Sequence, residues 1–175
     1  MRLSFVALLL SFIAFCSIAA NAQGQWVEER PAGAGYRIEF PGTPKSSTQD
    51  VDTRAGSVRM YMSEFSTNDD TIFLSIYSIY PENSLSTDTQ KALSSARDGG
   101  VNNVKGKLRS ERRLSVGGAP ATRVVIDIPE SNQTGVALIV LSGNRLYQAI
   151  TVVPAGQETS ADVMRFIDSF ALVSR

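Results

Sequence analysis

Histidine is absent from the 175-residue sequence, and cysteine occurs only once. Without histidine the chain cannot build a Ser-His-Asp or Cys-His catalytic site, and it cannot bind a metal through imidazole. A single cysteine excludes both a disulfide framework and a zinc site made of cysteines. The sequence also lacks the Gly-rich loops that bind phosphates and the G-x-S-x-G motif of serine hydrolases. We therefore expect no enzymatic activity and no cofactor.

An excess of either charge is also missing, because 17 basic residues balance 17 acidic ones. This balance argues against nucleic acid as a partner, since nucleic-acid-binding proteins carry clustered positive charge. Apolar residues make up 43% of the chain and charged residues 19%, which is typical of a folded globular protein. The length suits one domain.

Long hydrophobic runs are absent except at residues 3–20. The small-x-small pattern Ala20-Asn21-Ala22 follows this run directly, as at a signal-peptidase site. We therefore expect a signal peptide at residues 1–22 and a single domain at residues 23–175, exported to the periplasm or secreted. An uncleaved membrane anchor is the alternative, because the run is close to the minimum length that spans a bilayer.

The pattern of apolar and polar residues predicts eight strands, most of them joined by short turns. Several alternate between apolar and polar residues, whereas residues 136–141 are a continuous apolar run. Short turns connect antiparallel neighbours, so we expect a largely antiparallel sheet. One segment is apolar on both faces and should lie inside a sheet that is covered on both sides. This segment is residues 71–80. The other strands are expected at residues 26–29, 36–40, 57–65, 107–116, 121–128, 136–141 and 145–153.

Two helices are expected among these strands. The first spans residues 87–104, where Thr87 and Gln90 have the spacing of a capping box. Gly99 and Gly100 either end this helix early or let it pack closely on the sheet, and the apolar stripe that continues beyond them favours close packing. The last helix begins after residue 156 and carries a helical stripe of four apolar residues, Val163, Phe166, Ile167 and Phe170.

Several turn and core motifs follow one another along the chain: Tyr36-x-Ile38-x-Phe40-Pro41-Gly42-x-Pro44, Ala96-Arg97-Asp98-Gly99, Lys105-Gly106-Lys107-Leu108, Gly118-x-Pro120, Gly143-Asn144-Arg145-Leu146-Tyr147 and Phe166-Ile167-Asp168-Ser169-Phe170. Their order resembles that of PsbP-like domains. The resemblance implies an α+β fold in which an antiparallel sheet lies between helices, an α/β/α sandwich. Family members include an extrinsic photosystem II subunit, a Ran-binding transport factor and mycobacterial envelope lipoproteins, so the resemblance also implies an adaptor function. It carries over no binding residue.

A basic segment at residues 97–113 has a net charge of +4. Five of its residues form a candidate docking patch for an acidic protein surface or for anionic lipid headgroups at a membrane: Lys105, Lys107, Arg109, Arg112 and Arg113. The first three alternate and would share one face if the strand begins early enough. The favoured alternative is an edge strand whose cations prevent edge-to-edge pairing with other molecules.

Aromatic residues gather on the expected strands 57–65 and 71–80. They are Tyr61, Phe65, Phe73, Tyr77 and Tyr80. We expect most of them to form a core beneath a helix, although they would also suit the wall of a ligand groove.

Close acidic pairs give the remaining candidate site. Besides Glu28-Glu29, the close acidic pairs are Asp69-Asp70 and Asp50-x-Asp52. Paired carboxylates could share a proton or hold Ca²⁺, but Asp69-Asp70 lies in an expected turn, where aspartate serves local hydrogen bonding.

These observations favour an exported, non-enzymatic binding or adaptor domain whose partner is an envelope protein or another envelope component. The alternative is a carrier of small molecules or lipids that uses an aromatic-lined cleft between sheet and helix. An enzyme that uses carboxylates alone is the third hypothesis.

Overall fold

Seven antiparallel strands form the main sheet of the computed structural model, which describes residues 25–53, 56–82, 84 and 88–173. The expected signal peptide lies outside these residues. In spatial order the strands are β3 (Lys45–Thr53), β4 (Gly56–Ser66), β5 (Ile72–Ile79), β9 (Arg145–Pro154), β8 (Gln133–Ser142), β7 (Ala119–Ile128) and β6 (Lys107–Val116). Every neighbouring pair is antiparallel, so the expectation of a largely antiparallel sheet is confirmed.

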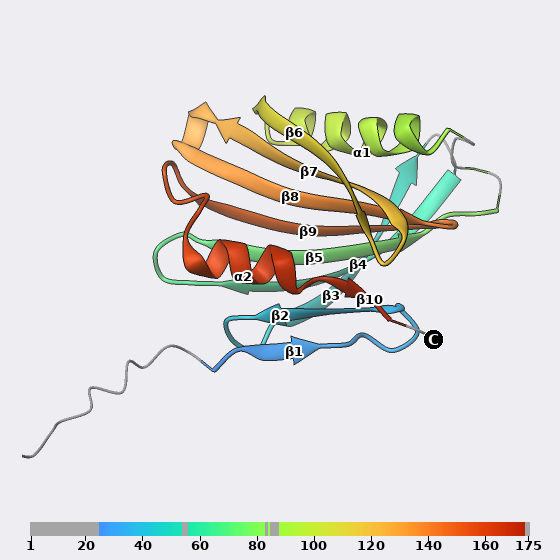
Figure 1. The fold of residues 1–175 in the computed structure, drawn as a ribbon, viewed down its shortest axis with the longest axis horizontal. Helices are drawn as coiled ribbons and strands as arrows, with labels where there is room; N and C mark the ends of the chain where they lie inside the picture. The colour runs from blue at the N-terminus through green and yellow to red at the C-terminus, as the bar shows by residue number, and fades with distance from the viewer. Residues whose placement is uncertain (1–24, 54–55, 83, 85–87, 174–175) are drawn as a thin grey trace, which may run out of the picture.

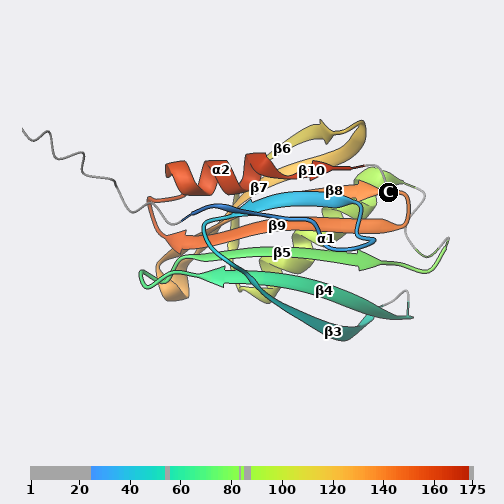
Figure 2. The same ribbon diagram turned by 90° about the horizontal axis from the view of Figure 1, so that it is seen from below.

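A smaller sheet and two α-helices cover the main sheet (Figure 1). The small sheet consists of β1 (Val27–Glu29), β2 (Tyr36–Phe40) and β10 (Ala171–Leu172), and it lies on the same face as α2 (Ala161–Ser169). The helix α1 (Thr89–Asn103) lies on the opposite face, as Figure 2 shows from below. A single 3-10 turn, η1 (Pro129–Ser131), connects β7 to β8. This arrangement is the expected α+β sandwich.

Two hydrophobic cores result because successive strand residues point to opposite faces. On β8, Leu138 and Val140 pack toward α2 and the small sheet, whereas Ile139 and Leu141 pack toward α1. Both faces of this strand are therefore buried. No helix in the described part of the chain is both long and apolar enough to cross a membrane.

The apolar stripe of the last helix is confirmed. Val163, Phe166 and Ile167 of α2 are buried, and so is Phe170, which ends the helix. Phe166 lies edge-on to Phe40 of β2 and to Phe73 of β5, so the helix joins the small sheet to the main one.

The first helix differs from the prediction in two respects. It begins one residue later than the capping box implies, because the side chain of Asp88 accepts hydrogen bonds from the backbone N–H groups of Gln90 and Lys91. Thr87 lies outside the described residues. The helix does continue through Gly99 and Gly100, but a Cβ added at either glycine would meet nothing within 4 Å. Close packing on the sheet is therefore the wrong explanation for this glycine pair.

Two strands lie where the sequence pattern predicts none. β3 is mostly exposed and mostly polar, and it pairs with β4 over its whole length at one edge of the main sheet. β10 is two residues long and pairs with β2. Backbone hydrogen bonds to a neighbour define both strands, so neither needs an apolar alternation that a sequence pattern would reveal.

Candidate functional site

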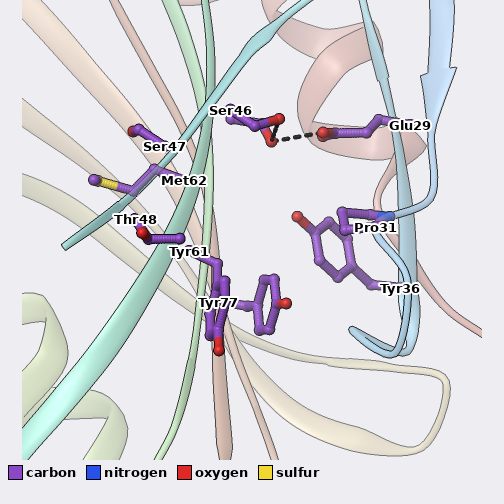
Figure 3. A pocket seen from close by; sticks show the side chains of 10 residues that line it. Glu29, Pro31, Tyr36, Ser46, Ser47, Thr48, Tyr61, Met62 and Tyr77 are labelled. Carbon is purple, nitrogen blue, oxygen red and sulfur yellow. Dashed lines mark hydrogen bonds between the residues drawn. The ribbon is translucent and has the colours of Figure 1, made fainter. Parts of the chain in front are cut away.

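An open hollow of about 390 Å³ lies between the small sheet and the β3–β4–β5 end of the main sheet. Figure 3 shows the side chains that line it. They come from β1, β2 and the segment between them, and from the three strands opposite: Glu29, Pro31, Tyr36, Ser46, Ser47, Thr48, Tyr61, Met62, Ser63 and Tyr77. These lining residues belong to strands and loops, so the hollow is a cleft between two sheets rather than the expected cleft between sheet and helix.

Stacked tyrosines form one wall of the hollow. Tyr61 of β4 lies directly opposite Tyr77 of β5, and their ring centroids are 4.6 Å apart with planes only 7° from parallel. Tyr36 of β2 lies edge-on to Tyr77 at 5.8 Å. The ring of Tyr36 also contacts Tyr147 and Phe170 in the core, so the wall is held in place from behind. This part of the site is organised before any ligand enters.

Glu29 supplies the one carboxylate among the residues that line the hollow. The hydroxyl of Ser63 donates a hydrogen bond of 2.6 Å to Oε1 of Glu29. Oε2 is buried, and no hydrogen bond to it meets normal geometry within the described structure. Burial raises the pKa of Glu29, and the hydroxyls of Ser63 and Ser75 offset only part of this shift.

A chain of hydroxyl groups surrounds this carboxylate. The Tyr36 hydroxyl lies 3.0 Å from the Ser75 hydroxyl, and the Ser46 hydroxyl lies 3.4 Å from that of Ser63. Burial raises the pKa of Tyr36 well above its ordinary range, so this phenol stays neutral. The site can therefore donate and accept hydrogen bonds around a single acidic group.

The neighbouring residue Glu28 has the opposite environment. Its carboxylate points away from the hollow and forms ion pairs with Arg30 at 2.5 Å and Arg37 at 3.1 Å. The hydrogen bond from Arg30 is the main reason that the pKa of Glu28 is lowered. Glu28 is therefore paired with cations at the surface, whereas Glu29 has no cationic partner among the residues that line the hollow.

A Glu29→Gln variant is expected to be more stable than the wild type at pH 7. Because the folded state raises the pKa of Glu29, it holds the proton more tightly than the unfolded state does. The wild type therefore loses stability as the pH rises from the ordinary glutamate pKa through the raised one, and the neutral amide avoids this loss. Thermal denaturation at several pH values measures the effect. The advantage of the variant should disappear below about pH 4, where both states of the wild type are protonated. A lower stability than the wild type at pH 7 would contradict the prediction.

Some of the aromatic residues on β4 and β5 lie in the core and others line the hollow, which are the two roles that the sequence left open. Phe73 is buried and contacts Phe166 of α2, so it is part of the core beneath a helix. Tyr61 and Tyr77 line the hollow, as a ligand groove would require. Phe65 packs against the same core, and Tyr80 packs with the residues beneath α1.

The five basic residues of the candidate docking patch do not share one face. Lys105 lies in the turn after α1, where its φ is 50°, and its Nζ is 3.5 Å from Oε2 of Glu130. It is therefore outside the strand and does not alternate with Lys107 and Arg109. Arg109 lies at a bulge in the pairing of β6 with β7, and its guanidinium is paired with Asp127 and Glu158.

The three remaining basic residues, Lys107, Arg112 and Arg113, are exposed and form no ion pair with any residue that the structure describes. Arg112 lies opposite Arg123, which contacts Asp168 of α2. Arg113 shares the other face with Glu111, which is paired with Arg97 of α1. The strand β6 that carries them is an edge of the main sheet, the position that the edge-guarding hypothesis requires.

The acidic pairs take part in local contacts. Asp50 of β3 accepts two hydrogen bonds from Arg59 of β4, at 2.8 and 2.9 Å, and Asp69 accepts one from Thr67 inside its turn. Within the described ranges, no group of three or more metal-binding side chains comes together.

Sequence reasoning did not single out Glu29, although one signal for it was available. In an extended segment Val27 and Glu29 point to the same side, and in β1 both are partly buried while Glu28 is exposed. A carboxylate on the apolar side of a strand is unusual and indicates a site. The segment was too short to show which side was buried.

Comparisons with known proteins give a likeness in fold. No protein-family model matches the sequence, and no curated protein matches it. Among solved structures, cyanobacterial PsbP from Synechocystis is similar with a TM-score of 0.61 and 9% identity, over 90% of this chain and 98% of that protein. A Pseudomonas aeruginosa protein of unknown function is aligned over 77% of this chain and 87% of its own, at 10% identity and a TM-score of 0.36. The second value is too low to support an argument.

Proposed function

Because this chain has the PsbP-like fold, we propose that it is an exported binding domain without enzymatic activity. A fold does not by itself determine a function, so the proposal depends on a site. That site is the hollow between the two sheets, and the observation that carries it is the stacked pair of Tyr61 and Tyr77 beside the carboxylate of Glu29. Concave sites with an apolar wall and a few polar groups are where proteins bind small ligands.

The absence of catalysis in this proposal is supported by the composition of the hollow. Its ionisable groups are one carboxylate and three tyrosines. General acid–base chemistry commonly uses two groups whose pKa values are driven apart, and here a single carboxylate is accompanied by the hydroxyl groups of tyrosines and serines. Such a set can hold a ligand through stacking and hydrogen bonds.

Tyr61 is the residue that tests this function most directly. We expect a panel of neutral, cationic and anionic fragments to include some that shift the NMR signals of Ser46, Tyr61 and Tyr77 in the isotope-labelled protein. Tyr61→Ala should abolish the shifts of Ser46 and Tyr77, because it removes the more exposed ring of the stacked pair. Ile79→Ala is the control, since Ile79 lies at the end of β5, outside the hollow, with 41% of its surface exposed. The proposal fails if no fragment produces shifts centred on the hollow.

The unpaired cations of β6 favour a second candidate function, docking to an acidic envelope protein. Exposed charges contribute mainly to encounter rate and register rather than to folding. Arg112 and Arg113 are better targets than Arg109, because reversing the charge of Arg109 would bring a third carboxylate to Asp127 and Glu158.

We expect the double variant Arg112→Glu, Arg113→Glu to keep its stability but to retain fewer envelope proteins on an affinity column at low salt. Retention by the wild type should also fall near 1 M salt, where the Debye length is about 3 Å. The control is Lys45→Glu, Lys91→Glu, which makes the same change of charge at exposed positions away from β6. If the two double variants and the wild type retain envelope proteins equally, the docking function is wrong and edge protection is the role of these cations.

A further inference from the structure

The carboxylate of Glu29 lacks a cation. Among the residues that line the hollow it is the one charged group, and its partners are serine hydroxyls. Its second oxygen accepts no hydrogen bond of normal geometry from any described residue. Removing a carboxylate from water without an opposite charge is unfavourable, so a cationic ligand in the hollow would be stabilised electrostatically.

Two cationic side chains near the tyrosine wall have other partners. Arg59 of β4, whose charge interacts with Tyr61, donates hydrogen bonds of 2.8 and 2.9 Å to Asp50. Arg145 of β9 affects the pKa of Tyr77 through its charge, so it lies close to the tyrosine wall. Its Nη1, however, donates hydrogen bonds to the backbone carbonyls of Gly33 at 2.6 Å and Ala34 at 2.9 Å. Arg145 therefore fixes the loop between β1 and β2 through Nη1, while its Nε is buried without a hydrogen-bond partner in the described structure.

The tyrosine wall also favours a positively charged ligand. The face of an aromatic ring carries partial negative charge and attracts a cation. Tyr61 is partly exposed in the hollow and is backed by Tyr77, so its position is fixed before a ligand enters. Met62 and Pro31 add apolar surface beside the rings. A cation with an apolar stem would contact both kinds of surface.

We propose that the hollow binds a primary alkylammonium ion, with its ammonium group beside Glu29 and its alkyl stem against Tyr61 and Tyr77. This inference depends on the proposed function, because it names the ligand class of the same site. A divalent metal ion fits less well, since calcium takes six to eight oxygen ligands and the hollow offers a single carboxylate. The ligand could be a free amine or the lysine side chain of a partner protein, which present the same chemistry.

The test compares ligands that differ only in charge. n-Butylammonium, n-butanol and n-butyrate are each titrated into the isotope-labelled mature protein at pH 7. The NMR shifts at Tyr61 and Tyr77 give the dissociation constant of each ligand. We expect butylammonium to bind at least about tenfold more tightly than butanol, because a charge-assisted contact adds to the contact of the stem. Butyrate should bind more weakly than butanol. Equal binding of butylammonium and butanol would overturn the inference.

Adjacent glutamates provide matched variants. Glu29→Gln should reduce the affinity for butylammonium by at least about tenfold and leave that for butanol unchanged. Glu28→Gln removes the same charge one residue away, where the carboxylate faces Arg30 and Arg37, and should change neither affinity substantially. Affinity of the wild type for butylammonium should also fall as acid protonates Glu29, whereas that of Glu29→Gln should not depend on pH in this range. Equal effects of the two variants would contradict the role of Glu29.

The outcomes separate this inference from the proposed function. If butanol and other neutral fragments bind the hollow as tightly as butylammonium does, the hollow is a ligand site but the ligand is not an ammonium ion. If no fragment binds there, both proposals fail. A blocked lysine peptide distinguishes the two sources of the ligand: binding tighter than that of butylammonium indicates a partner's lysine, and weaker binding indicates a free amine.

Discussion

Replacing Phe166 with alanine is expected to lower the free energy of unfolding by about 3–5 kcal/mol. Phe166 is fully buried, and its ring centroid is 5.0 Å from that of Phe40 and 5.3 Å from that of Phe73. Alanine would leave a cavity where α2, β2 and β5 meet, and it would remove both edge-to-face contacts. Because a domain of this size has a total stability of only about 5–15 kcal/mol, the variant should unfold at a much lower denaturant concentration, measured by circular dichroism.

Met164 provides the control on the same helix. Its side chain is 36% exposed, so Met164→Ala should change the stability by less than about 1 kcal/mol. If Phe166→Ala unfolded at the same denaturant concentration as the wild type, α2 would not pack between the two sheets. In that case α2 would also not hold the small sheet, which forms one side of the hollow, against the main sheet.

The parts of the fold that the sequence predicted are those with a strong apolar period. The helix stripe that contains Phe166 specifies which side of α2 is buried, and the two apolar faces of β5 indicate a strand that is covered on both sides. The Gly117-Gly118 pair predicted the turn after β6 equally clearly, because glycine readily adopts the positive φ that a tight hairpin turn requires. In the structure both residues have positive φ. Local chemistry is sufficient in each of these cases.

The parts that the sequence did not predict depend on partners that are distant in the chain. β3 is a strand because β4 pairs with it, and its polar residues give no sign of this. The hollow is formed by residues of β1 and β2 on one side and of β3, β4 and β5 on the other. Glu29 lies beside Ser63 only after the small sheet folds onto the main one, so spacing along the chain could not place them together.

The sequence also suggested the wrong glycines for close packing against the sheet. The close approach of backbone that the sequence suggested for Gly99 and Gly100 occurs instead at Gly106, between α1 and β6. A Cβ on Gly106 would lie 2.5 Å from the Cγ2 atom of Ile126 and 2.9 Å from the carbonyl oxygen of Asp127. Periodicity locates a helix face, but it does not reveal which glycine another strand approaches.

Gly106→Ala is therefore expected to destabilise the protein by about 1–3 kcal/mol. The carbonyl of Asp127 belongs to the backbone of β7, so it cannot rotate away as a flexible side chain would. Gly106 also closes α1, since its N–H donates to the carbonyl of Val101 at 2.9 Å while Lys105 adopts the left-handed conformation before it. Relief of the clash would have to shift either this cap or the first residues of β6. Urea denaturation of the variant measures the loss.

The same substitution at Gly100 should have the opposite sign. A Cβ there meets nothing within 4 Å, and alanine has a higher helix propensity, so Gly100→Ala should raise the stability by about 0.5–1 kcal/mol. The two variants add the same methyl group within one short segment, so composition and the unfolded chain contribute nearly equally to both. A difference in sign therefore isolates the contact with β7. If Gly106→Ala were as stable as Gly100→Ala, the end of α1 would not lie against Ile126 and Asp127, and the connection from α1 to the basic edge strand would have to follow another path.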